Sequence, residues 1–266
     1  MKYLFGKTVI VTGASSGIGL KISERLIKKY DCTVLAIARN INKLEAAKNQ
    51  IDAVRYIPFS CDVSKLQEWE RLKSYILESD LKPNILINCA GIMLPFIKTE
   101  NLTLEDFSKV LSTDFYSVLY SLQTVVPLLC GDKGLINISS SSSLCPIAGQ
   151  SPYVAAKSAV KSLTEVLQTE EKYYVGLMLP GFCKTDIMRS IDVSDKEKRL
   201  IDKVSITSEK CAKKICNAIN KKRRRKIIGL DAKLMNFLYK IAPKSAGRII
   251  AWVLRKSKLK IFEGIQ

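Results

Sequence analysis

Residues Thr8 to Gly19 read TVIVTGASSGIG. The β-branched run that opens this stretch predicts a buried strand, and the glycine-rich turn after it ends that strand. Beyond the turn, apolar residues recur on one helix face at Ile18, Ile22, Leu26 and Ile27. A strand, a glycine turn and a helix present free backbone N–H groups and the positive end of a helix dipole to an anion. The stretch therefore predicts a phosphate-binding turn in an α/β protein.

Each glycine of the turn has its own expected task. Gly13 allows the tight turn, Gly17 lets the backbone approach a pyrophosphate, and Gly19 lets the helix pack close to the strand. Glycines also occur in plain turns, so the pattern alone leaves a structural alternative open. The spacing T-G-x-x-x-G-x-G resembles that of the short-chain dehydrogenase/reductase family. The resemblance adds three further dinucleotide contacts in this turn, Ser15, Ser16 and Ile18.

The composition limits the chemistry of the protein. The 266 residues suffice for one large core, and the hydrophobic fraction of 47% is ordinary for a globular protein. The eight cysteines are scattered without C-x-x-C spacing, which favours reduced thiols over a disulfide framework or a zinc site. The sequence has no histidine, which excludes Ser-His-Asp and Cys-His nucleophiles and a histidine general base. Proton transfer must therefore use tyrosine, lysine, a carboxylate, cysteine or water.

Targeting and membrane-spanning segments are not evident. The first predicted strand begins by residue 8, which leaves no room for the hydrophobic core of a signal peptide. No run of 18 apolar residues occurs, so no simple membrane-spanning helix is predicted. We expect a cytoplasmic protein without a metal site, with peripheral contact to a membrane as an open alternative.

Strand-like and helix-like segments alternate along the chain. Further strands are expected at 33–38, 54–59, 85–88, 135–139 and 175–179, and helices at 42–50, 65–78, 104–129 and 153–170. This order is typical of a parallel sheet with helices on both faces. We predict an α/β, three-layer, doubly wound Rossmann fold for residues 1–230, which form the dinucleotide-binding catalytic domain. Residues 231–266 are predicted to form a basic amphipathic C-terminal helical extension.

Ligands of such folds bind at the C-terminal ends of the strands. Arg39 follows the second strand, where an acidic residue suits the ribose 2′-hydroxyl of NAD and an arginine suits a 2′-phosphate. Together with Ser15 in the glycine turn, Arg39 predicts NADP(H) as the cofactor. A solvated arginine in a turn is the structural alternative.

The next two strand ends carry motifs that resemble those of the same family. Asp62 and Val63 follow the third strand, where the family contacts the adenine ring; an aspartate that caps the next helix is the alternative. Residues 88–91 read N-C-A-G and resemble the family motif N-N-A-G. The resemblance implies that Asn88 supports the central sheet, while Ala90 and Gly91 let the backbone pass beside the cofactor.

The sixth strand is followed by residues that resemble the family motif P-G-x-x-x-T. The resemblance implies that Pro180 and Gly181 lie against the cofactor and that Thr185 bonds the nicotinamide carboxamide. Residues 186–206 are then predicted to form a mobile, charged flap. Three apolar residues of this flap could face a substrate, Ile187, Met188 and Ile191.

Tyr153 and Lys157 are four residues apart and so lie on one face of the predicted helix. Tyrosine is a weak acid with a reference pKa of about 10, and a nearby ammonium and a positive nicotinamide both favour its phenolate. Tyr153 can then pass a proton to a carbonyl oxygen as hydride reaches the carbon, and take it back in reverse. Ser140 lies 13 residues earlier, where the resembling family has the serine that polarises this oxygen. An incidental Y-x-x-x-K on a surface helix is the alternative.

The family completes this catalytic set with an asparagine in the long helix, where this chain has Asp114. In the family that asparagine helps to hold a water next to the lysine, largely through its main-chain carbonyl. An aspartate keeps that carbonyl, and its charge would either stabilise Lys157 or raise the pKa of Tyr153. We predict that Asp114 is a tolerated substitute; a shifted helix, in which it has no role, is the alternative.

The charge of the chain is concentrated near its C-terminus. The formal net charge is +18, and residues 221–260 hold 14 Lys and Arg but a single acidic residue, Asp231. Two apolar and basic segments flank Pro243, which predicts two short amphipathic helices. Such helices suit an anionic membrane surface. A lid over the substrate site, a contact with a second subunit and, least favoured, a nucleic-acid surface remain open.

Taken together, the motifs predict an NADP(H)-dependent oxidoreductase that acts on a carbonyl or alcohol, with Tyr153 as general acid/base. The tail and the apolar flap residues favour a lipophilic substrate, such as a steroid or a fatty compound. The family resemblance implies a homodimer or homotetramer. The rival hypothesis is a non-catalytic dinucleotide sensor or membrane-surface adaptor that keeps the same fold.

Overall fold

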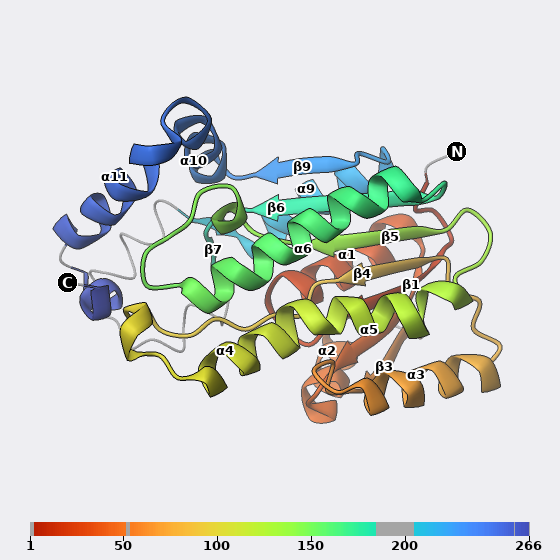
Figure 1. Ribbon diagram of the computed structural model, residues 1–266. Helices are drawn as coiled ribbons and strands as arrows, with labels where there is room; N and C mark the ends of the chain where they lie inside the picture. Colours follow the sequence, from red (N-terminus) through yellow and green to blue (C-terminus); the bar gives the residue numbers. More distant parts are fainter. Residues whose placement is uncertain (1–2, 52–53, 185–204, 258, 266) are drawn as a thin grey trace.

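The structure, a computed structural model, describes residues 3–51, 54–184, 205–257 and 259–265. Its centre is a sheet of seven parallel strands in the order β3-β2-β1-β4-β5-β6-β9 (Figure 1). The strands are β1 (Thr8–Thr12), β2 (Thr33–Ala38), β3 (Tyr56–Ser60), β4 (Ile85–Asn88), β5 (Gly134–Ile138), β6 (Tyr174–Pro180) and β9 (Arg225–Ile228). The predicted doubly wound parallel sheet is therefore confirmed.

Helices cover both faces of the sheet and make three layers. One face packs against α1 (Gly17–Tyr30), α2 (Ile41–Ile51) and α9 (Ser208–Asn220). The other face packs against α3 (Leu66–Glu78), α5 (Ser117–Thr124) and α6 (Ser151–Glu170). Successive residues of β1 alternate between the two cores, since Val9 and Val11 join the first and Ile10 joins the second. Strands that are buried on both faces explain the nearly continuous apolar runs in the sequence.

The chain reverses its direction across the sheet between β1 and β4. It first runs outward from β1 to β3, then returns to β4 on the other side of β1. The Thr12 hydroxyl accepts hydrogen bonds from the backbone N–H groups of Cys89 and Ala90, at 2.9 and 3.0 Å. This contact ties the ends of the two strands together at the point where folds of this kind bind ligands.

The helix expected over residues 104–129 is divided in the structure. α4 (Leu104–Leu111) continues through a π-helical turn (Ser112–Tyr116) into α5, which ends at Thr124. Pro127 follows in a short 3₁₀ turn, and its missing N–H prevents the α-helix from continuing there. The predicted helix was therefore too long at its C-terminal end. The π-helical turn has no signal in the hydrophobic spacing.

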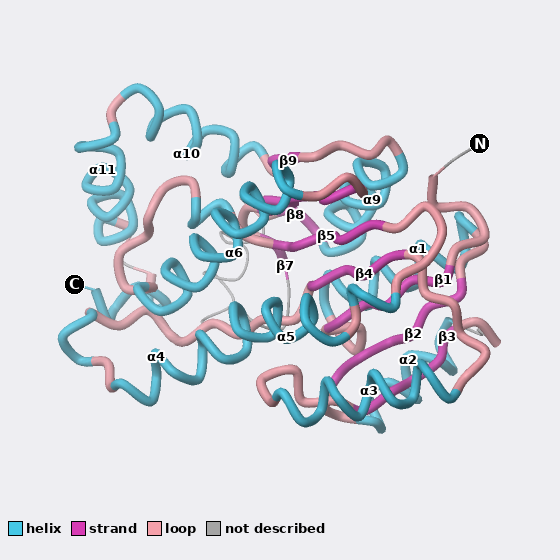
Figure 2. The backbone as a smooth tube through the Cα atoms, turned by 45° about the vertical axis from the view of Figure 1, so that its right-hand side comes forward, coloured by secondary structure: helices cyan, strands magenta, loops and turns pink. Residues whose placement is uncertain are grey.

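The C-terminal extension is helical, as predicted. α10 (Leu230–Ile241) and α11 (Pro243–Lys256) are separated at Ala242, directly before the proline, and a 3₁₀ turn follows at Lys260–Ile265. Figure 2 shows both helices at the end of the molecule away from α3. Their inner faces join an apolar cluster with the loops after β4 and β5, which consists of Phe96, Cys145, Ile147, Met235, Ala246, Phe262 and Ile265.

Two further features complete the fold. A second sheet pairs β7 (Cys183–Lys184) with β8 (Ile206–Thr207), two strands too short to be predicted from the sequence. Within the described ranges, no helix is both long enough and apolar enough to cross a membrane.

Candidate active site

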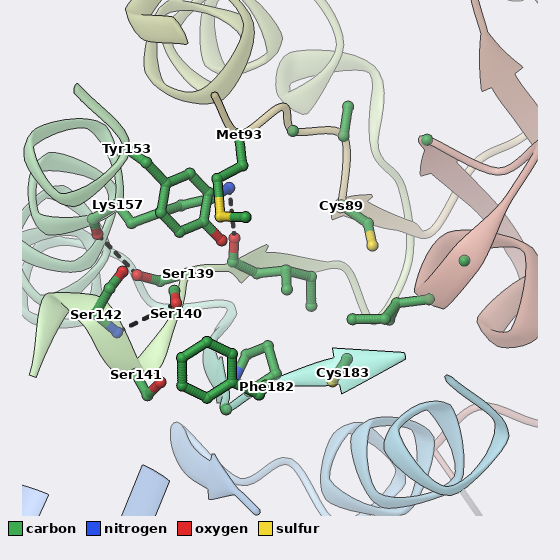
Figure 3. A pocket seen from close by; sticks show the side chains of 18 of the residues that line it. Cys89, Met93, Ser139, Ser140, Ser141, Ser142, Tyr153, Lys157, Phe182 and Cys183 are labelled. Atoms are coloured by element: carbon green, nitrogen blue, oxygen red, sulfur yellow. Dashed lines mark hydrogen bonds between the residues drawn. The ribbon is translucent and has the colours of Figure 1, made fainter. Parts of the chain in front are cut away.

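A cavity of about 210 Å³ lies at the C-terminal ends of β1, β4, β5 and β6. It is bounded by the glycine turn, the turn after β4, the serine run after β5, the first turns of α6 and the segment after β6 (Figure 3). The strand ends thus converge as the sequence predicts. Most predicted cofactor residues line this cavity: Gly13, Ser16, Gly17, Ile18, Gly19, Ala90, Gly91, Tyr153, Lys157, Pro180 and Gly181.

The glycine positions of the turn are required by backbone geometry or by close packing. Gly13 and Gly17 have φ angles of +69° and +50°, which other residues rarely adopt. A Cβ on Gly13 would lie 3.0 Å from the Cα of Ala90, and a Cβ on Gly19 would lie 2.3 Å from the Gly13 carbonyl oxygen. Ser16, the N-cap of α1, makes no side-chain hydrogen bond to the helix. The N-terminus of α1 therefore faces the cavity as a bare backbone cradle, which fits a pyrophosphate.

Arg39 is exposed at the end of β2, outside the lining of the cavity. The glycine turn lies beside this strand end, because the Ala14 N–H donates to the Ile37 carbonyl at 3.1 Å. Among the described residues, no acidic side chain forms an ion pair with Arg39. Its guanidinium is therefore available to an anion near Ser15, which itself does not line the cavity.

Asp62 and Val63 also lie outside the lining of the cavity. The Asp62 carboxylate accepts hydrogen bonds from the backbone N–H and the hydroxyl of Ser64, at 3.2 and 2.7 Å. This arrangement stabilises the turn that precedes α3, whose N-cap is Lys65. Asp62 therefore stabilises the turn just before α3 and is not the N-cap residue of that helix.

Asn88 ties the central strands to two helices. Its amide donates to the Ser121 hydroxyl at 3.0 Å and to the Asn137 side-chain oxygen at 2.9 Å. Asn137 in turn donates to the Thr164 hydroxyl at 3.0 Å. This buried chain of hydrogen bonds joins β4 and β5 to α5 and α6, so Asn88 supports the sheet behind the cavity.

Tyr153 and Lys157 extend from α6 into the cavity together with Ser140 from the serine run (Figure 3). The Lys157 ammonium lies 5.7 Å from the centre of the Tyr153 ring and donates to the Ile138 carbonyl at 3.4 Å. The Ser140 hydroxyl accepts from the Ser142 N–H at 3.2 Å, which orients it at the start of a 3₁₀ turn. The pair predicted from helical spacing and the serine implied by the resemblance therefore meet in one cavity.

Asp114 lies directly behind this group. The π-helical turn buries its carboxylate, and its Oδ2 atom is 3.0 Å from the Lys157 Nζ. Its Oδ1 atom accepts from the Ile92 N–H at 2.7 Å. The contact with Lys157 is an ion pair without hydrogen-bond alignment, since Oδ2 has no aligned donor within the described part of the chain. The alternative in which Asp114 is remote from the site is wrong.

The turn after β4 must contain a glycine next to this ion pair. A Cβ on Gly91 would lie 2.8 Å from the Asp114 Oδ2 atom and 3.1 Å from the Lys157 Nζ. Any larger residue would push against two buried charged groups at once. The close approach explains the second glycine-bearing motif of the sequence in steric terms.

The site shifts the pKa values of its three titratable groups. Burial raises the pKa of Tyr153, the Lys157 ammonium opposes this shift, and the Asp114 carboxylate adds to it. Burial also raises the pKa of Asp114, against the lowering effects of Lys157 and the Ile92 N–H. Burial alone would lower the pKa of Lys157, but the attraction of Asp114 and Tyr153 outweighs it, so this pKa is raised. Lys157 therefore keeps its proton in the cavity.

One wall of the cavity is apolar and was not predicted. It is formed by Met93 and Phe96 after β4, Ile147 before α6, and Phe182 after β6. Loop residues have no periodicity, so no local pattern predicts this wall. The predicted contacts Thr185, Ile187, Met188 and Ile191 lie outside the described residues.

Two hydrogen bonds that support the site were also missed. The Ser139 hydroxyl donates to the Lys157 carbonyl at 2.7 Å, and the Gln150 amide donates to the Leu94 carbonyl at 2.9 Å. The first fixes the turn of α6 that carries Lys157 against the end of β5, and the second fixes the loop after β4 that carries Met93 and Phe96. The run of five serines was visible in the sequence, but nothing distinguished the task of Ser139 from that of its neighbours.

Several known proteins resemble this chain in sequence or in fold. Residues 7–196 match the short chain dehydrogenase family. A putative oxidoreductase, SadH, from Mycobacterium tuberculosis is 29% identical over 92% of this chain and 94% of its own length. An NADPH-dependent pterin aldehyde reductase from Arabidopsis thaliana is 29% identical over 69% of this chain and 78% of its own length. A short chain dehydrogenase/reductase from Burkholderia phymatum in complex with NAD shares the fold, with a TM-score of 0.80 and 19% identity over 92% of this chain and 96% of its own.

Proposed function

This chain belongs to the short-chain dehydrogenase/reductase family and is an oxidoreductase, and from this premise we propose that it moves hydride between NADP(H) and the carbonyl or alcohol carbon of a lipophilic substrate. The observation that carries the proposal is the convergence of Ser140, Tyr153 and Lys157 in one cavity beside the glycine cradle. The chemistry of these three groups matches proton transfer to and from an oxygen atom.

The chain offers a complete set of groups for the cofactor. The bare N-terminus of α1 would hold the pyrophosphate, Lys157 would hold a ribose hydroxyl, and Pro180, Gly181 and Thr185 would lie along the nicotinamide. When bound, the nicotinamide supplies or accepts the hydride. The preference for NADP(H) rests on Arg39, which is exposed, has no acidic partner within the described residues and lies at the strand end next to the glycine turn.

Tyr153 acts as the general acid and base in this proposal. In reduction its hydroxyl donates a proton to the carbonyl oxygen of the substrate, and in oxidation it takes the proton of the alcohol. The Ser140 hydroxyl donates a hydrogen bond to the same oxygen and stabilises the charge that develops there. Lys157 stabilises the phenolate of Tyr153, because its ammonium lowers the pKa of the tyrosine against the effect of burial.

Asp114 acts through Lys157 and is a positioning residue. Its carboxylate holds the ammonium at 3.0 Å and is itself held by the Ile92 N–H. A charged pair at this place fixes the lysine more firmly than a neutral amide would. The cost is a higher pKa of Tyr153, because the carboxylate favours the protonated tyrosine.

The apolar wall supports a lipophilic substrate. Met93, Phe96, Ile147 and Phe182 line the cavity and belong to one apolar cluster. Such a wall favours ligands with apolar surface and has few polar groups to bind a sugar or an amino acid.

The test is the loss of NADPH absorbance with a panel of lipophilic ketones and aldehydes, with Tyr153→Phe as the matched variant. We expect the phenylalanine variant to lose about 10²-fold or more in turnover, because it lacks the transferable proton, while it still binds NADPH. Turnover that survives in this variant would contradict the role of Tyr153. Tight NADPH binding without turnover on any carbonyl compound would favour a dinucleotide sensor.

A further inference from the structure

α10 is apolar on two opposite sides. Ala232 and Met235 are buried against the body of the protein. On the other side, four large side chains are 83%, 57%, 58% and 67% exposed, Leu230, Leu234, Phe237 and Ile241 in that order. Their spacing of four, three and four residues places them in one row along the helix. Single exposed apolar residues are ordinary in proteins, but a continuous row of them marks an interaction surface.

α11 adds a second exposed apolar group. Ile249, Trp252 and Val253 share one helix face and are 46%, 58% and 51% exposed. The two helices pack against each other, so their exposed groups belong to one end of the molecule (Figure 2). We call these seven residues of α10 and α11 the outer stripe. The indole of Trp252 carries an N–H on an apolar ring, a combination that suits the headgroup level of a bilayer.

The charges around the outer stripe all have one sign. The two helices carry six cations, Lys233, Lys240, Lys244, Arg248, Arg255 and Lys256. Across the described ranges, none of the six forms an ion pair with an acidic side chain. The single acidic residue of the two helices, Asp231, accepts a hydrogen bond from the Phe182 N–H at 2.6 Å and is thus engaged on the cavity side. The outer side of α10 and α11 is therefore apolar and basic.

Charge selects one occupant for this surface. A second copy of the chain would bring an equally basic surface toward the first, and like charges oppose that contact. A nucleic acid would satisfy the cations but would leave the aliphatic Leu230, Leu234 and Ile241 without a partner, because bases stack on aromatic rings. An anionic bilayer satisfies both features, with acyl chains for the apolar row and lipid phosphates for the cations.

We propose that α10 and α11 dock this protein on the surface of an anionic phospholipid bilayer through the outer stripe. The helices lie in the plane of the membrane with their apolar side chains below the headgroups, while the cations remain at headgroup level. Neither helix crosses the membrane. Docking is reversible and weakens with salt, because part of the attraction is electrostatic.

Docking would place the cavity next to the lipid. The inner faces of the same two helices pack on Phe96 and Ile147, which line the apolar wall. The N–H of Phe182, a third residue of that wall, is bonded to α10 through Asp231. A lipophilic substrate dissolved in the bilayer would therefore meet the wall of the cavity directly beneath the docking helices. This consequence rests on the proposed function, whereas the docking itself does not.

The experiment is co-sedimentation of the full chain with vesicles, in the absence of cofactor and substrate. Vesicles of phosphatidylcholine containing roughly 30% phosphatidylserine are compared with vesicles of pure phosphatidylcholine. We expect about tenfold stronger binding to the anionic vesicles, and loss of that difference at high salt. Trp252 provides a second readout, because the only other tryptophan, Trp69, is fully buried. Its fluorescence should shift to shorter wavelength on binding.

The matched variants separate the outer stripe from general surface hydrophobicity. The double variant Leu234→Ser/Phe237→Ser removes two residues of the stripe and should weaken vesicle binding about tenfold. The control Leu77→Ser/Leu104→Ser removes two residues that are 63% and 81% exposed on other helices, and it should bind like the unaltered chain. Both variants should keep the circular dichroism spectrum and the melting temperature of the unaltered chain, which report that they are folded.

Four results would overturn the proposal. Equal binding to neutral and anionic vesicles would mean that the cations do not contribute to docking. An unchanged Trp252 emission would mean that the outer stripe does not contact the lipid. The unaltered chain could also fail to bind vesicles, while the stripe variant sediments without vesicles as a smaller particle than the unaltered chain. That result would assign the surface to a contact with a second copy. Binding of a DNA oligonucleotide without vesicle binding would assign the cations to nucleic acid. Failure of the hydride-transfer proposal would leave all of these readouts unaffected.

Discussion

Charged side chains are buried and paired in the cavity, whereas those beside the outer stripe are exposed to solvent. In the cavity, Lys157 and Asp114 are almost fully buried and lie 3.0 Å apart. On α10 and α11, six cations face solvent without an acidic partner in the described ranges. Burial lowers the local dielectric, which strengthens a paired charge and makes an unpaired one costly. Single substitutions should therefore have large effects in the cavity, and only small, additive effects among the cations of the stripe.

The largest effect is expected when the buried pair is broken. Lys157→Met keeps the length of the side chain but leaves the Asp114 carboxylate unpaired in the interior. Removing one partner of such a pair costs about 3 kcal/mol of the free energy of unfolding. Turnover should fall by about 10³-fold, because Tyr153 loses the ammonium that favours its phenolate. Thermal denaturation and NADPH turnover measure the two effects.

The pH dependence of this variant identifies the cause. Without Lys157, the pKa of Asp114 rises further above its value in the unfolded chain, so the folded protein binds the extra proton. The stability defect of Lys157→Met should therefore shrink as the pH falls and grow as the pH rises. The double variant Lys157→Met/Asp114→Asn should regain most of the lost stability but none of the turnover. A defect that does not change with pH would mean that lost packing, not an unpaired charge, destabilises the variant.

The contrast between the two regions also explains what the sequence could reveal. In the cavity, helical spacing predicts that Tyr153 and Lys157 share one face of a helix, and the family resemblance adds Ser140 to them. The glycines of the turn can also be predicted from the sequence, because a positive φ angle or a close backbone contact requires that residue type. Parallel strands buried on both faces give strong apolar runs, so the alternation of segments predicts a parallel sheet with helices on both faces.

Other features depend on the tertiary arrangement and leave no local signal. The π-helical turn that aims Asp114 at Lys157 has the same hydrophobic spacing as an ordinary helix. The apolar wall comes from three loops, and Phe96 and Phe182 line the same cavity only after the sheet has formed. In the C-terminal extension the sequence shows two amphipathic helices, but only the structure separates their buried inner faces from the outer stripe.

Arg39, which follows β2, and Lys233 on α10 should differ in their effect on the affinity for the cofactor. Arg39→Ala removes the group proposed to bind the 2′-phosphate, so the affinity for NADPH should fall about tenfold or more, with little change for NADH. Lys233→Ala on α10 removes the same charge from the exposed helix and should change neither affinity. Titration of both cofactors into the two variants measures this. An equal loss for NADPH and NADH would mean that Arg39 does not read the 2′-phosphate.

The smallest expected effect concerns the charge of Asp114 alone. Asp114→Asn keeps an oxygen that can accept the Ile92 N–H, but it removes the carboxylate that raises the pKa of Tyr153. The pKa of Tyr153 should therefore fall, but it stays under the influence of Lys157 and of burial, which both remain. Alcohol oxidation requires the deprotonated tyrosine, so its pH profile should move to lower pH in this variant. Carbonyl reduction requires the protonated tyrosine and should begin to decline at lower pH.

Two observations decide whether the charge or the fit of Asp114 matters. Asp114→Ala removes the acceptor for the Ile92 N–H as well, and should lower turnover at every pH besides shifting the profile. If Asp114→Asn left both turnover and pH profile unchanged, the carboxylate would be only a tolerated replacement for an amide. If instead the profile shifts while NADPH affinity is unchanged, the buried charge tunes the tyrosine through space. The cavity would then differ from the outer stripe in a second respect: its charges set the proton affinity of a neighbour, whereas those of the stripe only attract a partner.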